Sequence, residues 1–175
     1  MLKRRNNLNL YKNISMLNER SLNINLDFVK FIRCWIPVII WLGIIFWMST
    51  NTFSSEQSSQ FVMPVIHFLF NWLSPQGTDL MHQIIRKFGH IAVYFVFGLL
   101  LFRAFCGESS QRWNLRWMVY SVILIIFVAM SDEFHQSFVA SRTSSPFDVA
   151  IDSAGGIFSQ LAILFREKTF GLNSE

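Results

Sequence analysis

The sequence predicts an all-α polytopic membrane protein with about four transmembrane helices plus a short interfacial or re-entrant helix. First, 52% of the 175 residues are hydrophobic and only 15% are charged, against roughly 25% charged in an ordinary soluble domain. Second, four apolar runs approach the ~17–25 residues that a spanning helix needs. Third, none of them alternates polar with apolar residues as a barrel strand does. This composition excludes a disordered chain and does not fit a water-soluble globule.

The four predicted spans are residues 31–48, 88–105, 117–131 and 149–165. The third run is the shortest, so it can cross a bilayer only if the helix extends at its ends. A fifth apolar stretch, residues 61–73, is too short to span and contains Pro64. We therefore expect it to lie at the interface or to form a re-entrant helix.

These spans divide the chain into three parts, a basic Asn-rich leader (1–30), a transmembrane domain (31–166) and a short tail (167–175). The basic residues predict its orientation. Twelve of the 15 Lys and Arg residues precede or begin the first span, end the second span, separate it from the third or follow the fourth. Because Lys and Arg concentrate in cytoplasmic loops, we expect both termini in the cytoplasm of a bacterial cell. The net charge of +4 is then a topology signal, and we expect no nucleic-acid partner.

The opposite side of the membrane receives six of the 11 carboxylates and all four histidines. One polar group lies near the start of the second span, where Lys87, His90, Tyr94 and Gly98 fall within about 80° on a helix. Ionisable groups at membrane depth usually face a bundle interior or a water-filled cavity. His90 is equally well explained by a hydrogen bond to a neighbouring helix. Lys87 is better explained as a side chain whose ammonium reaches the lipid headgroups than as part of a site.

A second polar group, Asp132-Glu133-Phe134-His135-Gln136, ends the third span. If the helix continues, Asp132, His135 and Gln136 share one face, and Glu133 points about 100° away from Asp132. An Asp and a His three residues apart fit a metal site or an acid–base pair. The spacing matches no zinc signature, and we expect neither a metal nor another cofactor. The alternative is that these groups meet headgroups and water at a helix end.

The third polar group begins the fourth span. Ser145 reads as an N-cap, Pro146 as the first helical residue and Asp148 as the third residue of a capping box. A cap would explain Asp148 without any chemistry. Arg142 can pair with a nearby carboxylate, or its guanidinium can clamp a phosphate or carboxylate ligand.

Asp152 lies one turn inside the fourth span. A carboxylate at this depth requires a partner, for which His90, Lys87 and Arg142 are the candidates. We therefore expect Asp152 to shape the polar site.

Three sequence blocks carry a family resemblance: the Ser-rich stretch 49–58, Arg86-Lys87-Phe88-Gly89-His90 with Tyr94, and Asp132–Phe138 followed by Arg142, Asp148, Asp152 and Gly155. Together these blocks, within residues 35–165, resemble the VanZ-like family of small bacterial membrane proteins. The chain departs from the family at Ala140-Ser141, where Pro-Gly is frequent, and at Asp152, where Asn is frequent. The additional carboxylate leaves the charge of the site open.

The resemblance implies membrane residence, a link to the cell envelope and an association with glycopeptide resistance, because the founding member is associated with teicoplanin resistance. We therefore expect a non-enzymatic envelope factor that acts through an outward-facing polar site. Its partners would be the lipid bilayer and a lipoglycopeptide or an envelope lipid or peptidoglycan component. The candidate cluster consists of Lys87, His90, Tyr94, Asp132, Glu133, His135, Gln136, Arg142, Asp148 and Asp152.

Two other functions remain open at this stage. The first is an intramembrane enzyme that acts on a lipid-linked substrate, with His90 or His135 as general base, Asp132 or Glu133 as acid or metal ligand, and Arg142 as phosphate clamp. The second is a small transporter. The polar residues gather at one end of the spans, which does not favour a continuous pathway.

Overall fold

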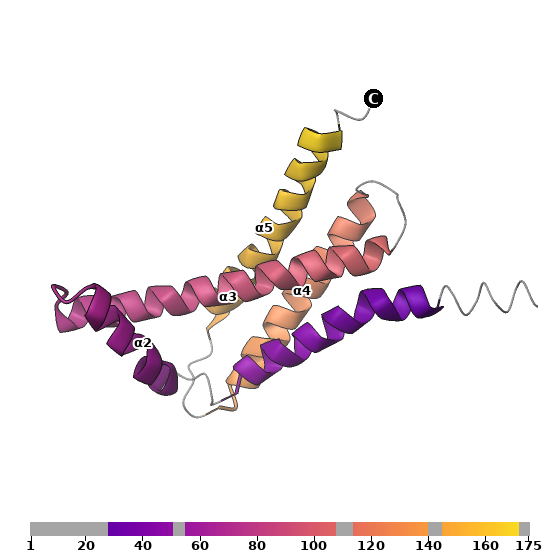
Figure 1. Ribbon diagram of the computed structural model, residues 1–175. Helices are drawn as coiled ribbons and strands as arrows, with labels where there is room; N and C mark the ends of the chain where they lie inside the picture. Colours follow the sequence, from indigo (N-terminus) through magenta and orange to yellow (C-terminus); the bar gives the residue numbers. More distant parts are fainter. Residues whose placement is uncertain (1–27, 51–54, 108–113, 140–144, 172–175) are drawn as a thin grey trace, which may run out of the picture.

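The computed structural model describes residues 28–50, 55–107, 114–139 and 145–171, which form five helices and no strand (Figure 1). An N-terminal helix, Phe28–Met48, is followed by α2 (Ser55–Leu69), α3 (Pro75–Cys106), α4 (Leu115–Gln136) and α5 (Pro146–Gly171). All except α2 are long and apolar enough to cross a membrane. The predicted all-helical fold class with four spans is thereby confirmed.

The helices extend beyond the predicted spans, and α3 does so most. It begins at Pro75, where the Ser74 hydroxyl accepts a hydrogen bond of 3.2 Å from the Gly77 N–H and Pro occupies the first turn. This serine–proline pair is a strong start signal. The 32 residues of α3 measure ~48 Å at ~1.5 Å per residue, well over the ~30 Å hydrocarbon core of a bilayer.

Helix α2 corresponds to the predicted interfacial or re-entrant segment, although it starts before residue 61 and ends at Leu69. Its 15 residues measure only ~22 Å, too short to span. It packs on the N-terminal turns of α3, where the Ser58 hydroxyl lies 3.2 Å from Nε2 of the buried His82. Ile66 is the buried apolar residue of α2.

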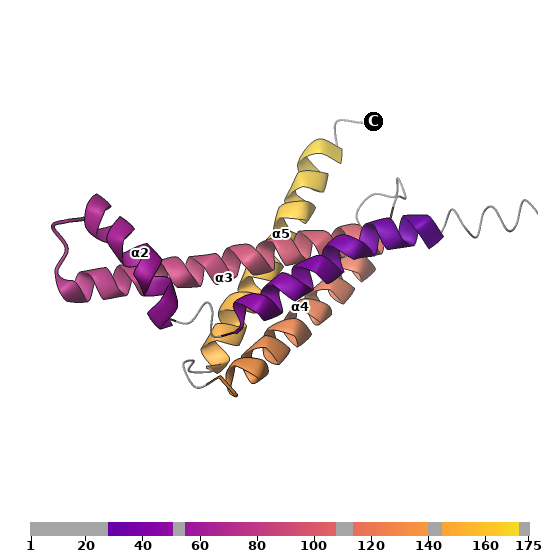
Figure 2. The same ribbon diagram turned by 60° about the horizontal axis from the view of Figure 1, so that its bottom comes forward.

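The N-terminal helix runs antiparallel to α3, along which it lies in both ribbon views (Figures 1 and 2). The ring of Trp35 meets Phe105 edge to face at 5.4 Å. Further along, the Trp41 indole N–H donates to the Val93 carbonyl at 3.0 Å. Such an anchor matters in a bilayer, because helix association there depends on close packing and hydrogen bonds rather than on the hydrophobic effect.

Helices α3 and α5 cross each other (Figures 1 and 2) and make the most extensive contact among α2 to α5. Glycines permit it: a Cβ on Gly155 would lie 2.5 Å from the Ile91 carbonyl oxygen of α3. Further along α5, the buried Gln160 amide donates a hydrogen bond of 2.9 Å to the Gly98 carbonyl of α3. Close backbone approach at small residues is a typical mode of packing between membrane helices.

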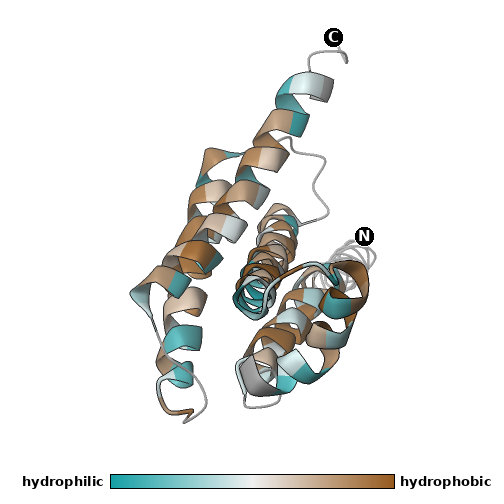
Figure 3. Ribbon diagram, turned by 90° about the vertical axis from the view of Figure 1, so that its left-hand side faces the viewer, coloured by the Kyte–Doolittle hydropathy of each residue, from teal (hydrophilic) through white to brown (hydrophobic). Residues whose placement is uncertain are grey.

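The outward faces of these helices are apolar. In the view of Figure 3, hydrophobic residues predominate along the middle of the long helices, and Phe127 and Phe165 are 65% and 72% exposed. The buried core is narrow and includes Phe97, Leu101 and Ile125. A helix bundle that is apolar both inside and outside fits lipid surroundings.

The polar residues gather at one end of the bundle, here named the polar end, where the N-terminal helix ends, α4 ends and α5 begins (Figures 1 and 2). There the Ser49 hydroxyl lies 3.0 Å from Nδ1 of His135. The opposite ends of the four long helices carry basic side chains. Those in the described residues are Lys30, Arg33, Arg103, Arg116, Arg166 and Lys168.

Candidate functional site

The contact between His90 of α3 and Asp152 of α5 is the central side-chain pair of the polar end. Nδ1 of His90 lies 3.2 Å from the Asp152 carboxylate, in hydrogen-bond contact. Asp152 is 1% exposed, whereas the His90 side chain retains 30% of its exposure. Of the three partners considered from sequence, His90 is therefore the one found on Asp152. The pair compensates a carboxylate that would otherwise be costly to bury.

The end of α4 buries Asp132, Glu133 and Gln136, while His135 is exposed. Asp132 accepts a hydrogen bond of 3.1 Å from the Gln136 amide, one helical turn away. Asp132 and Gln136 share one face as predicted from sequence, and Glu133 is buried as well. Glu133 and His135 lie on opposite edges of the buried face, so the elements that pack on each edge decide which of them is covered.

Glu133 faces the start of α5, where its carboxylate accepts the backbone N–H of Ser145. Ser145 is the N-cap predicted from sequence, since its hydroxyl accepts from the Phe147 N–H at 3.2 Å. The predicted capping box is nevertheless incomplete. Its second bond would join Asp148 to the Ser145 N–H, and Glu133 of α4 takes that place. Asp148 is half-buried at the third helical position.

His135 faces the N-terminal helix instead. Besides its contact with Ser49, its ring meets Phe46 edge to face at 6.3 Å. Ser49 is itself 1% exposed and joins His135 to the buried groups. Ser49 is absent from the cluster chosen by sequence. Its position at the end of the first apolar run, within the Ser-rich block, was the available signal.

The remaining members of the predicted cluster lie at the edge of the polar end or outside the described residues. Lys87 is exposed, and its ammonium lies 4.7 Å from the centre of the Phe147 ring, a distance suited to a cation–π contact. This contact joins α3 to α5 beside the pair of His90 and Asp152. Arg142 lies outside the described residues.

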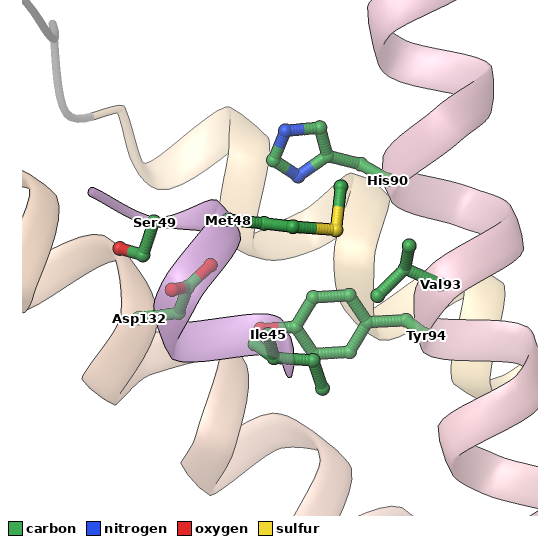
Figure 4. A pocket seen from close by; sticks show the side chains of 7 residues that line it. All are labelled: Ile45, Met48, Ser49, His90, Val93, Tyr94 and Asp132. Atoms are coloured by element: carbon green, nitrogen blue, oxygen red, sulfur yellow. The ribbon is translucent and has the colours of Figure 1, made fainter. Parts of the chain in front are cut away.

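A small pocket opens between the N-terminal helix, α3 and α4 (Figure 4). His90 and Tyr94 extend from α3 toward the N-terminal helix, and Met48 points back toward them. The cavity volume of about 20 Å³ holds one water-sized group, because a buried water needs at least ~10–15 Å³. A drug-sized ligand needs a pocket of ~300 Å³ or more. The lining residues are Ile45, Met48, Ser49, His90, Val93, Tyr94 and Asp132.

The described residues contain no group of three or more His, Cys, Asp or Glu side chains that could hold a metal ion. The side chains of the polar end offer buried carboxyl groups, the imidazoles of His90 and His135, and the hydroxyls of Ser49 and Tyr94. These groups can exchange protons and bind hydrogen-bond donors or cations.

Gln160 is a further buried polar residue that the sequence reasoning did not select. Its amide also donates to the Ser159 hydroxyl at 3.1 Å. Its side-chain oxygen and the Ser121 hydroxyl have no hydrogen-bond partner within the described part of the chain. Gly156 of α5 packs on Ile125 of the antiparallel helix α4. Gln160 and Ser121 each lie one helical turn from this contact, toward the basic ends of the helices, and so at a similar depth in the bundle.

Comparison with protein-family models gives a match to VanZ/LLP1 over residues 34–166, which is 133 of the 175 residues. The chain belongs to the VanZ/LLP1 family. The match covers all four candidate spans apart from their outermost residues. No curated protein and no solved structure matches the chain. Family membership and four apolar helices together identify a VanZ-like multi-pass membrane protein.

Proposed function

We propose that this VanZ-like protein is a non-enzymatic cell-envelope factor associated with glycopeptide resistance, which acts through its polar end at the outer face of a bacterial membrane. Teicoplanin carries an acyl chain that can lie in the bilayer, so a membrane protein has physical access to it. The ligand is a lipoglycopeptide of this kind or an envelope lipid or peptidoglycan component.

The observation that carries this proposal is the concentration of buried ionisable groups at the end of the bundle opposite most of its basic residues. Asp132, Glu133 and Asp152 are each at most 6% exposed. Several buried carboxyl groups cost stability unless they are paired or serve a function. The positive-inside rule puts the basic ends in the cytoplasm and the polar end outside.

The size of the pocket bears on how a ligand would bind. With about 20 Å³ of space, it accommodates one functional group and excludes a glycopeptide core. A large ligand would therefore rest on the surface of the polar end and insert a single group. Binding of this kind requires no bond cleavage, which favours a binding protein.

The alternative of a transporter is disfavoured by the apolar layer below the pocket. Ile125, Val128 and Ala129 of α4 are buried there with Phe97 of α3. They separate Asp132 from the second polar level at Gln160. An ion would have to cross this layer without any polar partner, which is costly.

The enzyme alternative rests on one observation, the contact between His90 and Asp152. A carboxylate that orients an imidazole is the usual arrangement of a general base. An enzyme would lose nearly all activity in Asp152→Asn, because Asn preserves the shape but not the charge. A binding site would weaken gradually, since Asn still accepts a hydrogen bond from His90.

The test is antibiotic susceptibility of a sensitive bacterial host that expresses the wild type, Asp132→Asn or His135→Ala at matched membrane levels. Asp79→Asn is the control, because it makes the same carboxylate-to-amide change at an exposed position of α3. We expect protection against teicoplanin and not vancomycin, lost in Asp132→Asn and retained in Asp79→Asn. A well-inserted wild type that gives no protection would overturn the proposal.

A further inference from the structure

Two buried polar atoms of the pocket have no hydrogen-bond partner within the described part of the chain. They are the Tyr94 hydroxyl and Oδ1 of Asp132, and their residues are 1% and 2% exposed. Buried polar atoms in native proteins nearly always have a partner, supplied by protein, water or ligand. Both atoms belong to residues that line the same cavity, so one occupant can satisfy both.

The charges of the polar end indicate what the occupant supplies. The Asp152 carboxylate contacts His90, and the Glu133 carboxylate accepts the Ser145 N–H. Asp132 meets the neutral amide of Gln136 on its other oxygen and the neutral hydroxyl of Ser49. Its Oδ1 has no hydrogen-bond donor among the described residues, and a positively charged donor gives the stronger bond.

The dimensions of the pocket restrict the occupant further. A volume of about 20 Å³ suits a group as small as water or an –NH₃⁺ group. A trimethylated ammonium is larger and has no N–H to donate. The lining also includes the apolar side chains of Ile45, Met48 and Val93, which the carbon atoms next to the nitrogen can contact. His90 is partly exposed, which leaves an opening beside it.

We propose that the pocket between the N-terminal helix, α3 and α4 binds a primary ammonium group through Asp132 and Tyr94. The N–H donors of such a group match the two unpartnered oxygens of the pocket, those of Asp132 and Tyr94. The Ser49 hydroxyl points away from the cavity (Figure 4) and lies against His135 instead. The group comes either from an aminophospholipid headgroup or from a small free amine. This inference rests on the polar end assigned under the proposed function and names the ligand chemistry of that same site.

Lipid binding tests the inference with two headgroups that differ only in three N-methyl groups. The full-length protein is placed in nanodiscs that contain equal amounts of phosphatidylethanolamine and phosphatidylcholine, and retained lipids are counted by native mass spectrometry. We expect the wild type to prefer phosphatidylethanolamine about tenfold, equivalent to about 1.4 kcal/mol. Asp132→Asn should abolish this preference and Tyr94→Phe should reduce it, whereas Asp79→Asn should retain it.

A second measurement distinguishes the two sources of the amine. Ethanolamine or choline is added to the protein in nanodiscs made only of phosphatidylcholine, and the unfolding temperature is recorded. Stabilisation by ethanolamine but not by choline supports a free amine as ligand. A preference seen only with the intact phospholipid supports the headgroup.

Three results would overturn the inference. One is equal retention of the two lipids together with no effect of ethanolamine, as expected if the cavity holds only water. The second is an undiminished preference in a well-folded Asp132→Asn. The third is a preference lost equally in Asp79→Asn. If the protein protects against the antibiotic but shows no amine selectivity, the proposed function stands and the amine site is wrong. If it selects amines but gives no protection, the amine site stands and the proposed function is wrong.

Discussion

Gly155→Ala is the substitution for which the structure predicts the clearest effect on both stability and the site. The added Cβ would lie 2.5 Å from the Ile91 carbonyl oxygen and 2.9 Å from its Cα, which are backbone atoms of α3. Ordinary contact begins at 3.4 Å, so α3 and α5 must separate by 0.9 Å. A similar displacement would stretch the 3.2 Å contact of His90 with Asp152 to about 4 Å, beyond the hydrogen-bond range.

Overpacking of this kind costs about 1–3 kcal/mol. Alanine also gains up to ~1 kcal/mol over glycine in a helix, so the comparison needs a control that has the gain without the clash. Gly89→Ala provides it, because a Cβ there meets nothing within 4 Å. We expect Gly155→Ala to be less stable than Gly89→Ala by about 1–3 kcal/mol.

Equilibrium unfolding of the purified protein in mixed micelles, with a rising fraction of sodium dodecyl sulfate and circular dichroism as the readout, measures this difference. Lower amine selectivity in Gly155→Ala would show that helix separation reaches the site. If both variants unfold at the same detergent fraction, the close approach of α3 and α5 at Gly155 is refuted.

Three further substitutions test individual contacts by the same unfolding assay. Trp41→Phe removes the N–H that donates to Val93 at 3.0 Å and should cost about 0.5–1.5 kcal/mol; no loss would show that the bond does not hold the N-terminal helix. Glu133→Gln retains an acceptor for the Ser145 N–H, whereas Glu133→Met leaves that donor unpaired, at a cost of about 1–3 kcal/mol. Glu133→Gln should therefore be the more stable of the two. Equal stabilities would contradict the hydrogen bond between Glu133 and Ser145. Gln160→Met removes the two hydrogen bonds that the amide donates to the Gly98 carbonyl and the Ser159 hydroxyl, so it should cost about 1–3 kcal/mol. It should leave antibiotic protection intact, whereas lost protection would favour a polar pathway through the bundle.

The spans could be predicted from sequence because hydrophobic length alone identifies them. The start of α3 was missed, although Ser74-Pro75 carries the same signal that correctly located the start of α5 at Ser145-Pro146. At 74–75 the signal precedes a stretch that is less apolar than a span. The hydropathy criterion therefore overlooked the part of α3 on which α2 packs.

The site was predicted less completely, because helical periodicity does not show which neighbour covers each edge of a buried face. Glu133 and His135 lie on the two edges of the α4 face, and the predicted cluster contains both without showing which of them is covered. The structure buries Glu133 against the start of α5 and leaves His135 exposed beside Ser49. Ser49 lies far from the rest of the cluster in sequence, so only the antiparallel packing of the N-terminal helix reveals its place in the site.

The account depends most directly on the polar end facing the outside of the cell. Cys34 and Cys106 are replaced by alanine, and single cysteines are introduced by Phe138→Cys, just after α4 at the polar end, and Leu115→Cys, at its basic end. Both positions are exposed, at 74% and 57%. A membrane-impermeant maleimide should label Phe138→Cys in intact cells and Leu115→Cys only after permeabilisation. The reverse pattern would put the buried carboxylates on the cytoplasmic side and contradict the proposed envelope function.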